Sequence, residues 1–506
     1  MASRRDELNA YTFAKKRLVA QFLQPSPTGT EEGAPRPLRA VVPGLIIGVV
    51  IMAGFGAWGM FKPQAPEKWD DVGKNIIIGS ESTTRYVVLK TGKGKAQLHP
   101  VLNLASAKLL VNENSGDPVK VAEKILDNSK LRHGATLGIP YAPDRLPSKD
   151  EAEAAKRWVV CERPGTGGRA IQRAAFVFGE RDENKVEGRN KLRNGELMYV
   201  VGPGPTNRHY VVDKDGTAHQ IDPTDRKLLT QVVGPNREPQ RVSQDWLSTL
   251  HAGKSIHFPH LSGVGDPTQV KGLPPAYSKI GVVLKTSTAT RDQQYVVMRN
   301  KVAPVTDFVG KLLLNGPDAE KLRLGPTPKR VVGYTVDPGD PYVPEKGWPK
   351  QTGGGNVNSP RATEGSRNTA CNVLRKIDDK NNTTLSTWVG KDFPAQLPSG
   401  SSSGYVTPGS GQLFRQVQGH GKSGQIFLVT DTGLRYAMQG NGDSDKKKSG
   451  SGDNEKRKSK QQVQREAEIK LGFGDVIPRH IPADWADFLP TGPRLSSSSA
   501  KQPQGS

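Results

Sequence analysis

The run Gly419-His420-Gly421-Lys422-Ser423 resembles the end of a phosphate-binding loop, so it is the first place to look for chemistry. A complete loop needs a glycine five positions before its Gly-Lys pair, because backbone amides must wrap around the phosphates. Gln416 occupies that position, and no apolar strand with a clear crossover helix surrounds the run. The motif is incomplete, and an extracytoplasmic nucleotidase therefore stands only as the second alternative function.

Three histidines, His251, His257 and His260, cluster around Pro259 and could bind zinc if a loop gathered them. Their spacing fits no standard zinc site, and scattered surface histidines explain them better. The sequence also lacks a nucleophile elbow, a metalloprotease helix motif and a recognisable pair of glycosidase carboxylates. We therefore predict a protein that is not an enzyme, with no catalytic residue, metal or cofactor.

The chain contains two cysteines, Cys161 and Cys371. If both lie outside the cytoplasm, a disulfide between them can form and persist, and we predict this pairing rather than two separate buried thiols. Because the bridge would close a very long loop, it would stabilise the fold by roughly 4–5 kcal/mol on the loop-entropy argument.

The elements that position these residues begin with an uncharged stretch from Ala40 to Phe61, bounded by Arg39 and Lys62. About 20 apolar residues suffice to cross the hydrocarbon core of a bilayer as a helix. A cleaved signal peptide would have a shorter apolar core and a small-residue cleavage site. A buried core helix is disfavoured because the rest of the chain is polar. We predict one transmembrane helix that begins at Ala40 and ends at Phe61.

Basic residues are more frequent before this span than in the residues that follow it, so the positive-inside bias places the N-terminus in the cytoplasm. The large C-terminal region is then extracytoplasmic. Apolar residues before the span recur at helical spacing, namely Leu8, Tyr11, Ala14, Leu18 and Phe22. They predict an amphipathic helix on anionic lipid or against a partner helix, with a solvated basic helix as the equal alternative.

The 506 residues are enough for two or three compact cores, and the formal net charge is +22. Nucleic acid is a common partner of such basic chains. The predicted topology places most of the charge outside the cell, and the sequence has no zinc finger or recurrent aromatic RNA-binding signature. We therefore predict no nucleic-acid partner. Solubility explains the charge best, with anionic lipid or cell-wall polymers as the alternative counter-charges.

A short pattern of β-formers led by an aromatic residue recurs four times, starting at Tyr86, Tyr210, Tyr295 and Phe427. Turn residues such as Asp-Gly or Thr-Gly follow, which predicts hairpins. Leucine pairs downstream predict a short helix or strand that closes each unit. The third copy has Asn300 where a turn glycine would be comfortable, so its hairpin is expected to differ.

The four copies fall into two halves. Tyr86 precedes Cys161 by 75 residues, and Tyr295 precedes Cys371 by 76. Each half therefore reads repeat, cysteine segment, repeat, which predicts an internal duplication and a pseudo-twofold molecule. The fold class is α+β and β-rich, with four small repeats around a central β-rich core.

The predicted domains follow from these boundaries. They are 1–39 (cytoplasmic amphipathic segment and linker), 40–61 (transmembrane helix), 62–80 (linker), 81–148 (repeat 1), 149–205 (first segment of the central domain), 206–265 (repeat 2), 280–345 (repeat 3), 346–422 (second segment of the central domain), 423–495 (repeat 4, with a basic insertion at 440–460) and 496–506 (disordered tail).

Several blocks of the chain resemble the EccB family, membrane components of actinobacterial type VII (ESX) secretion systems. The resemblance covers nearly the whole chain in consistent order, and its most specific stretch is the His-Pro-Val-Leu-Asn run. The blocks that carry it are Arg4-Arg5-Asp6-Glu7-Leu8, Leu98-His99-Pro100-Val101-Leu102-Asn103-Leu104-Ala105-Ser106-Ala107-Lys108-Leu109-Leu110, Leu137-Gly138-Ile139-Pro140, Trp158-Val159-Val160-Cys161 and Phe488-Leu489-Pro490-Thr491-Gly492-Pro493.

The resemblance implies a single-pass scaffold in the cell membrane that joins EccC, EccD, EccE and other copies of itself in a secretion core complex. It also implies four repeats around a central domain that carries a disulfide. The expected function is therefore structural support of a protein export channel. A membrane-anchored cell-wall-binding protein or hydrolase is the first alternative.

Overall fold

The computed structural model describes residues 3–23, 38–61, 65–90, 94–112, 116–165, 170–204, 207–287, 292–332, 338–361, 366–398, 403–419, 421–439 and 465–504. The predicted basic insertion at 440–460 lies outside these residues. Contacts divide the chain into two compact units. The first consists of residues 1–69, 79–82 and 120–129, and the second of residues 70–78, 83–119 and 130–506.

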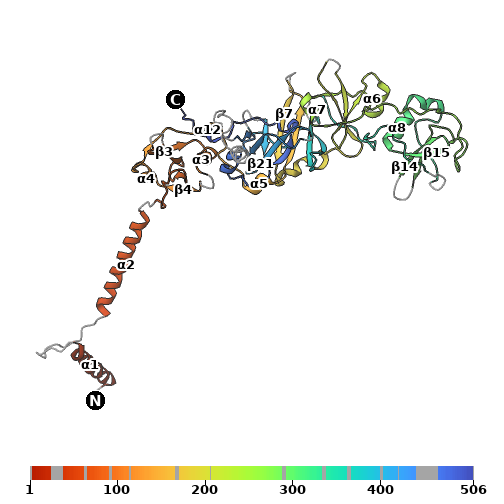
Figure 1. Ribbon diagram of the computed structural model, residues 1–506. Coiled ribbons are helices and arrows are strands. Elements are labelled where there is room, and N and C mark those ends of the chain that lie inside the picture. Colours follow the sequence, from red (N-terminus) through yellow and green to blue (C-terminus); the bar gives the residue numbers. More distant parts are fainter. Residues whose placement is uncertain are drawn as a thin grey trace, which may run out of the picture. The chain divides into compact units, whose positions relative to one another are not determined.

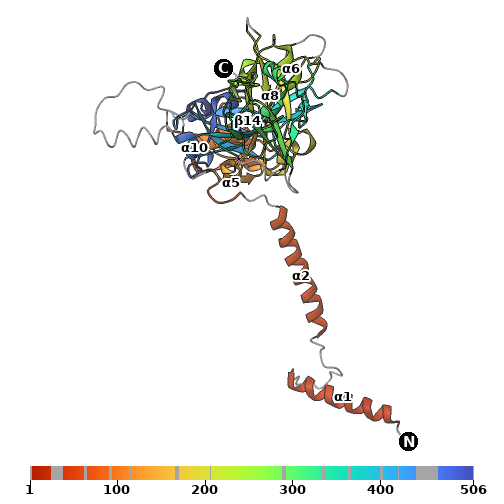
Figure 2. The same cartoon turned by 90° about the vertical axis from the view of Figure 1, so that its right-hand side faces the viewer.

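The first unit contains two long helices, α1 (Arg4–Leu23) and α2 (Leu38–Phe61), which are labelled in Figure 1 and can also be followed in Figure 2. The predicted helix before the span is present, and the apolar residues of the predicted pattern, Leu8, Tyr11, Ala14, Leu18 and Phe22, fall within about 120° of one another around it. At 100° per residue, Phe13 projects to the side opposite Tyr11, and Lys15 lies on the side of Leu8. The apolar face of this helix therefore also carries a basic residue, and one large apolar residue lies off it.

The strands form a central sheet and four smaller sheets among the described residues, and all of their residues belong to the second unit except those at 79–82 and 120–129. The central sheet has the order β19-β18-β6-β7-β20 and takes strands from both halves of the chain. Its elements, with the short helices beside it, are α5 (Lys149–Glu153), β6 (Arg157–Arg163), β7 (Gln172–Phe178), η2 (Glu180–Val186), η3 (Gly188–Asn190), β18 (Thr369–Ile377), β19 (Thr383–Gly390) and β20 (Gly404–Val406).

The smaller sheets of the first half of the chain define module 1 (residues 76–139) and module 2 (residues 196–256). Module 1 contains β1 (Ile76–Gly79), β2 (Arg85–Lys90), β3 (Ala96–Val101), α3 (Leu104–Leu110), β4 (Pro118–Val121), α4 (Glu123–Asp127) and β5 (Arg132–His133). Module 2 contains β8 (Glu196–Val201), β9 (His209–Val212), β10 (Thr217–Ile221), α6 (Arg226–Val232), β11 (Gln240–Arg241), α7 (Gln244–Ser248) and β12 (His251–Ala252).

The sheets of the second half define module 3 (residues 283–342) and module 4 (residues 411–495). Module 3 contains β13 (Val283–Ser287), β14 (Asp292–Met298), β15 (Lys301–Val305), α8 (Asp307–Asn315), η4 (Pro317–Leu322) and β16 (Lys329–Arg330). Module 4 contains β21 (Gly411–Val417), β22 (Ile426–Thr430), β23 (Arg435–Ala437), α10 (Glu466–Leu471), β24 (Arg479–Pro482) and α11 (Ala483–Ala486). Two short elements stand outside the modules, β17 (Gly355–Asn356) and α12 (Ser497–Ala500).

The four modules share one strand order. In each, three consecutive antiparallel strands are followed by a helix and by a short strand that returns beside the first strand. A segment then runs parallel to the third strand and contains a glycine whose N–H donates to that strand. These bonds are Gly134 to Leu98 O (2.9 Å), Gly253 to Ala218 O (2.9 Å), Gly339 to Val302 O (2.8 Å) and Gly492 to Arg435 O (2.9 Å).

A second bond repeats three residues later in every module. Its donors and acceptors are Leu137 to Pro100 O (2.9 Å), Ile256 to Gln220 O (2.8 Å), Tyr342 to Pro304 O (2.9 Å) and Leu495 to Ala437 O (2.8 Å). The modules differ in what faces the glycine. The side chains of His99, His219 and Tyr436 lie against it in modules 1, 2 and 4, whereas Ala303 holds the matching strand position in module 3.

The hydrophobic cores join the modules in pairs. One buried cluster contains residues of modules 1 and 4, such as Leu109 and Leu471, and another contains residues of modules 2 and 3, such as Leu228 and Leu312. A third cluster joins one face of the central sheet to modules 2 and 4. Modules 2 and 4 therefore pack on the central sheet, while modules 1 and 3 pack on modules 4 and 2.

Several predicted boundaries are corrected by these sheets. β1 lies within the predicted linker 62–80, β8 within the predicted central segment 149–205, and β21 within the predicted central segment 346–422. Each of these strands is the first strand of a module, since it pairs with the hairpin that follows it. The sequence pattern started each repeat at its second strand because the aromatic residue and turn signals lie there.

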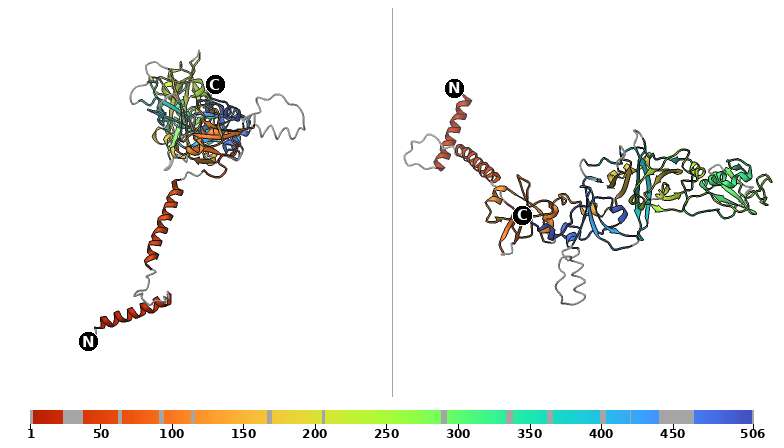
Figure 3. Two further views of the ribbon diagram at one scale, coloured as in Figure 1. Left: turned by 90° about the vertical axis from the view of Figure 1, so that its left-hand side faces the viewer. Right: turned by 90° about the horizontal axis from the view of Figure 1, so that it is seen from above.

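Two further expectations are wrong. The predicted disordered tail 496–506 contains α12, and its described residues pack on module 1 beside α3, where the blue C-terminal segment meets the orange strands (Figures 1 and 3). The hairpin of module 3 turns at Asn300 with φ of 56°, the left-handed conformation that Gly216 and Gly433 adopt in modules 2 and 4. Asparagine tolerates this conformation, so no glycine is needed there.

Candidate functional site: the disulfide-linked central sheet

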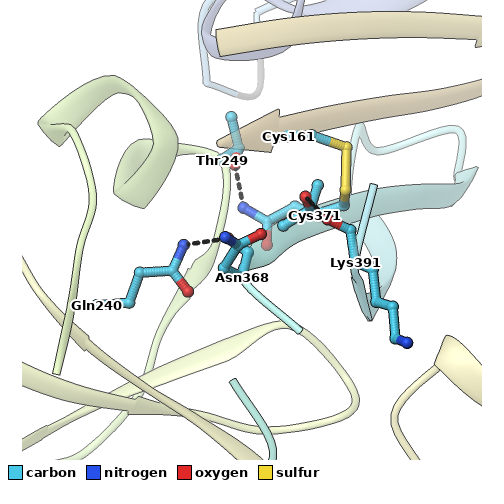
Figure 4. Close-up of a disulfide and its surroundings, with 8 residues drawn as sticks. Cys161, Gln240, Thr249, Asn368, Cys371 and Lys391 are labelled. Atoms are coloured by element: carbon cyan, nitrogen blue, oxygen red, sulfur yellow. Dashed lines mark hydrogen bonds between the residues drawn. A yellow bond between two sulfur atoms is a disulfide. The ribbon is translucent and has the colours of Figure 1, made fainter. Parts of the chain in front are cut away.

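The two cysteines face each other across the middle of the central sheet. β6 and β18 run antiparallel, and Cys161 lies directly opposite Cys371 in their register. The structure joins them by a disulfide with an S–S distance of 2.02 Å, drawn in Figure 4. Both side chains are fully buried among apolar residues that include Phe176, Phe178 and Trp388. The bridge therefore ties one strand of each half of the chain at the centre of the molecule's largest unit.

The opposite face of the same two strands holds helix α7 of module 2. Glu162 follows Cys161 directly, and its fully buried carboxylate accepts hydrogen bonds from the Ser243 N–H (2.7 Å) and the Ser243 hydroxyl (2.5 Å). The Arg173 guanidinium lies 3.2 Å from the same carboxylate. Burial raises the pKa of the Glu162 carboxyl, while the bonds from Ser243 and the charge of Arg173 act to lower it.

Asn372 follows Cys371 and contacts the other end of α7. Its side-chain N–H group donates to the Thr249 hydroxyl (2.6 Å) and to the Trp246 carbonyl (3.2 Å); the first of these bonds is drawn in Figure 4. Glu162 binds the first turn of α7 and Asn372 its last. The residues next to the two cysteines therefore form hydrogen bonds to both ends of one short helix. The disulfide on one face and these bonds on the other fix module 2 to both halves.

The second half of the chain also contributes residues that bind the edge of the module 2 sheet. The Gln240 side chain donates to the Asn368 carbonyl at 2.9 Å (Figure 4), and β17 pairs in parallel with the start of β8. The side chain of Asn358 then takes the place of a strand residue. Its amide oxygen accepts a hydrogen bond from the Tyr199 N–H (2.8 Å), and its amide N–H donates to the Tyr199 carbonyl (3.0 Å). A side chain thus completes the β8 ladder between β17 and β11.

The pairs of modules meet through helices. At the 2–3 junction, the contact of modules 2 and 3, the Lys311 ammonium of α8 donates to the Gln231 carbonyl of α6 at 2.5 Å. At the 1–4 junction, the contact of modules 1 and 4, Lys470 of α10 donates to the Leu109 carbonyl of α3 at 3.2 Å. Burial lowers the pKa of Lys311. In both junctions a lysine satisfies a carbonyl at the C-terminal end of the facing helix.

The block around the His-Pro-Val-Leu-Asn run, residues 98–110, forms a hydrogen-bonded cluster in module 1. Asn103 caps α3, accepting from Ser106 N (3.0 Å) and donating to the Ile139 carbonyl (2.8 Å). The Ser106 hydroxyl accepts from Ile139 N at 2.8 Å, and the His99 ring lies 2.9 Å from the Ala135 carbonyl. The His-Pro-Val-Leu-Asn block and the Leu-Gly-Ile-Pro block are therefore fastened to one another by side chains.

The predicted span ends, Ala40 and Phe61, both lie in α2, which begins two residues earlier at Leu38. The stretch Val41–Trp58 is long and apolar enough to cross a membrane, and none of it is buried by the rest of the described chain. Exposed side chains such as Leu45, Ile46 and Phe55 would be unfavourable in water. A lipid environment removes this cost, and α2 is therefore a candidate membrane helix.

The residues that first suggested chemistry are not brought together. His251 bonds the Thr383 hydroxyl (2.8 Å), His257 lies edge-on to Trp348 (5.1 Å between ring centres), and His260 lies near Asp318 (3.6 Å). No group of three or more metal-ligating side chains occurs within the described stretches of the chain. Lys422 precedes the strand β22 rather than a helix, and His420 lies outside the described residues.

Sequence reasoning missed Glu162 and Asn372. The available signal was a polar residue directly after each cysteine, inside a strand that is otherwise apolar. A polar side chain in a buried strand needs a partner, and the partner here is a helix of another module. The sequence signal indicates that such a partner exists but does not identify it.

The comparisons with known proteins agree with this architecture. The family described as "Type VII secretion system ESX-1, transport TM domain B" matches residues 1–505. The chain is 28% identical over 284 residues to a Mycolicibacterium smegmatis protein named "ESX-1 secretion system ATPase EccB1", covering 54% of each chain. It is 25% identical over 429 residues to "ESX-3 secretion system ATPase EccB3" of the same species, covering 79% of this chain and 75% of that protein.

The alignments to the first of these relatives are partial, and the chain spans about half the length of the EccB1 proteins it matches. Two solved structures are similar to the whole fold. One is "Structure of EccB3 dimer from the ESX-3 core complex" (TM-score 0.55, 21% identity, 84% of this chain and 99% of that chain). The other is "Structure of an intact ESX-5 inner membrane complex, Composite C3 model" (TM-score 0.55, 21% identity, 100% of this chain and 96% of that chain).

Three observations lead to one assignment: the family matches almost the full length, one apolar helix lies near the N-terminus, and the β-rich unit has the same fold as the solved structures. The chain belongs to the EccB family of type VII secretion system membrane components.

Proposed function

We propose that this protein is a structural subunit of a type VII secretion membrane complex, anchored by α2 and supporting assembly through its β-rich unit. The single observation that carries the proposal is the family match over residues 1–505. The similar solved structures support a role within a membrane complex and contacts with other copies, because one is an inner membrane complex and another a dimer. The expected partners are EccC, EccD, EccE and a second copy of this chain.

We further propose that α2 crosses the membrane with residues 1–39 in the cytoplasm and the second unit outside. The excess of Lys and Arg before the helix supports this orientation. The buried disulfide supports it as well, since such bonds persist in oxidising compartments. A cysteine introduced at Ser3 should be protected from a membrane-impermeant thiol reagent in intact cells, and one introduced at exposed Gln502 should react. The reverse labelling pattern would overturn the orientation.

The internal duplication is also a proposal. The common strand order and the two backbone bonds that recur in all four modules support it. In that scheme, modules 1 and 3 are equivalent, and so are modules 2 and 4. The pseudo-twofold axis passes between Cys161 and Cys371, whose strands pair symmetrically about them. Superposition of modules 1 and 2 on modules 3 and 4 by a rotation about this axis is the direct measurement.

The structural role is tested by mild detergent extraction and affinity purification of the full chain. We expect EccC, EccD and EccE to co-purify. A variant in which α2 is replaced by an unrelated apolar helix should keep both the lipid anchor and these partners, because we assign assembly to the β-rich unit. Recovery of the intact chain only as a free monomer, under conditions that preserve the complex, would overturn the proposal.

The word "ATPase" in the relatives' names motivates one competing test. Lys422 belongs to the motif that resembles a phosphate-binding loop, but a strand follows it where a phosphate-binding loop requires a helix. If the purified chain releases phosphate from ATP, Lys422→Ala should abolish the release only if this loop binds the nucleotide. Peptidoglycan hydrolysis by the same preparation would instead favour the cell-wall alternative.

A further inference from the structure

Residues 495–504 follow the last strand pairing of module 4 and continue onto module 1. The segment starts at Leu495, which forms a parallel bridge with Met438 and donates to the Ala437 carbonyl at 2.8 Å. Its backbone is therefore fixed to β23 at the start. From that point onward its contacts belong increasingly to module 1.

The middle of the segment, α12, packs on α3 of module 1. The Ser497 hydroxyl donates to the Glu466 carboxylate (2.8 Å) and lies 3.1 Å from the Lys470 ammonium. Lys470 also bonds Glu466 (3.1 Å) and the Leu109 carbonyl of α3. Ala500 is fully buried in the core that modules 1 and 4 share. One small network thus involves α12, α10 and α3 at once.

The last described residues bind the backbone of module 1 alone. Pro503 forms an antiparallel bridge with Leu137, and Gln504 donates from its N–H to the Thr136 carbonyl at 2.9 Å. The Gln504 side chain donates to the Gly138 carbonyl at 2.8 Å. The Thr136 and Gly138 carbonyls flank Leu137, whose own N–H donates to the Pro100 carbonyl of β3. The end of the C-terminal segment therefore pairs with residues 136–138 as an added strand would.

The corresponding segment of module 2 behaves differently because of its place in the chain. Residues 257–264 follow Ile256 as residues 496–504 follow Leu495, and they cover module 3, with Phe258 against Gly316 and Leu261 in the shared core. These residues run directly on to module 3. Gln504 instead reaches Gly138 across a separation of 366 residues. A contact that closes so long a loop gains little from chain connectivity.

We propose that residues 495–504 form a latch that holds module 1 on module 4, and that α3 with residues 136–138 forms a binding site for this segment as an exchangeable peptide. The latch sets how firmly the module that follows the membrane helix in sequence is attached to the rest of the second unit. The proposal goes beyond the structural role proposed above and does not depend on it.

The test uses the full chain in detergent and a variant that ends at Ser496, which keeps the Leu495 strand pairing. Hydrogen exchange is followed by mass spectrometry on peptides covering residues 98–110 and 132–139. We expect exchange there to rise about tenfold or more in the truncated chain, with modules 2 and 3 unchanged. A synthetic peptide of residues 494–506, added in excess, should restore protection, and a scrambled peptide should not.

A matched pair of point variants removes the concern that truncation disrupts folding. Gln504→Ala loses the bond to the Gly138 carbonyl and should raise exchange at residues 132–139, whereas Gln502→Ala changes an exposed side chain and should leave it unchanged. Unchanged exchange in module 1 after truncation would overturn the latch. A loss of protection spread over all four modules would also overturn it, since the segment would then be a general folding element.

Discussion

The 1–4 junction and the 2–3 junction are built on the same plan but are closed in different ways. Each buries an apolar core between two helices, and each directs a lysine at a carbonyl of the facing helix. Modules 2 and 3 are neighbours in the chain, so their junction needs only a short connection. Modules 1 and 4 are separated by most of the second unit's sequence, and the segment that covers their junction, residues 495–504, is not part of the chain that connects them.

This difference shows how chain order affects two junctions that are built on the same plan. Two equivalent surfaces can have similar side-chain chemistry and still differ in stability, because loop closure is unfavourable for the pair that is distant in sequence. At that pair the contacts of residues 495–504 form without a direct chain connection between the two modules. Substitutions at and between the two junctions test whether the junctions respond alike or separately.

The largest effect is expected from removal of the disulfide, which should weaken both junctions together. Cys161→Ala combined with Cys371→Ala releases a loop of 210 residues and should lower the free energy of unfolding by about 4–5 kcal/mol. Denaturant unfolding of the purified full chain measures this. Reductant should destabilise the native chain but leave the double variant unaffected, and equal stability of the two proteins would contradict the central role of the bridge.

The second-largest effect should distinguish module 3 from the other three modules. An alanine at Gly134, Gly253 or Gly492 would place its Cβ against the facing ring of His99, His219 or Tyr436, and we expect a loss of about 1–3 kcal/mol. Gly339→Ala is the matched control, since its nearest neighbour is the flexible Lys301 side chain at 3.4 Å. Thermal unfolding should rank the three ring-facing variants below Gly339→Ala. If all four variants were equally stable, the ring contacts would have no role.

A smaller effect should distinguish the two lysines. Lys311→Met removes one donor from the Gln231 carbonyl and should cost about 1–2 kcal/mol, because that carbonyl loses its charged partner. Lys470→Met also removes the ion pair with Glu466 and the bond to Ser497, so its cost should be the larger of the two. Hydrogen exchange should report the loss in modules 2 and 3 for the first variant and in modules 1 and 4 for the second.

The smallest effect is expected from the Glu123 carboxylate of α4 in module 1, whose titration serves as a pH control for both junctions. The N–H groups of Ser82 and Glu81 lower the pKa of Glu123 from 4.5 to about 2. Because the folded pKa is depressed, the bonds stabilise the turn fully above pH 4.5 and are lost as the pH falls toward 2. NMR titration should show the Glu81 and Ser82 amide signals moving with that midpoint. Glu123→Gln should remove the titration without altering either junction.

The sequence predicted the features that composition and spacing reveal directly. The uncharged stretch from Ala40 to Phe61 corresponds to α2, and the cysteine pair joins two strands that hydropathy alone would mark as buried. Turn residues such as Asp215-Gly216 located the hairpins. These signals are local, and they survive without knowledge of the tertiary fold.

Features that depend on distant partners were not predicted. The first strands of modules 2 and 4 were assigned to the centre because an apolar run such as Leu197–Val201 does not show which sheet it joins. The serines before Ala500 suggested disorder, yet their hydroxyls cap α12 and bond to Glu466. Glu162 and Asn372 carried only the signal of a polar residue in an apolar strand.

The position of the disulfide has a consequence in time. During synthesis, Cys161 is made 210 residues before its partner, an interval of roughly 10–40 s at about 5–20 residues per second. Until β18 arrives, β6 presents an unpaired strand edge and a free thiol. The chain has no third cysteine, so an incorrect bond within one molecule is impossible. A premature disulfide of Cys161 must involve a thiol of another molecule, and covalent dimers are therefore a misfolded product to look for when this protein is overproduced.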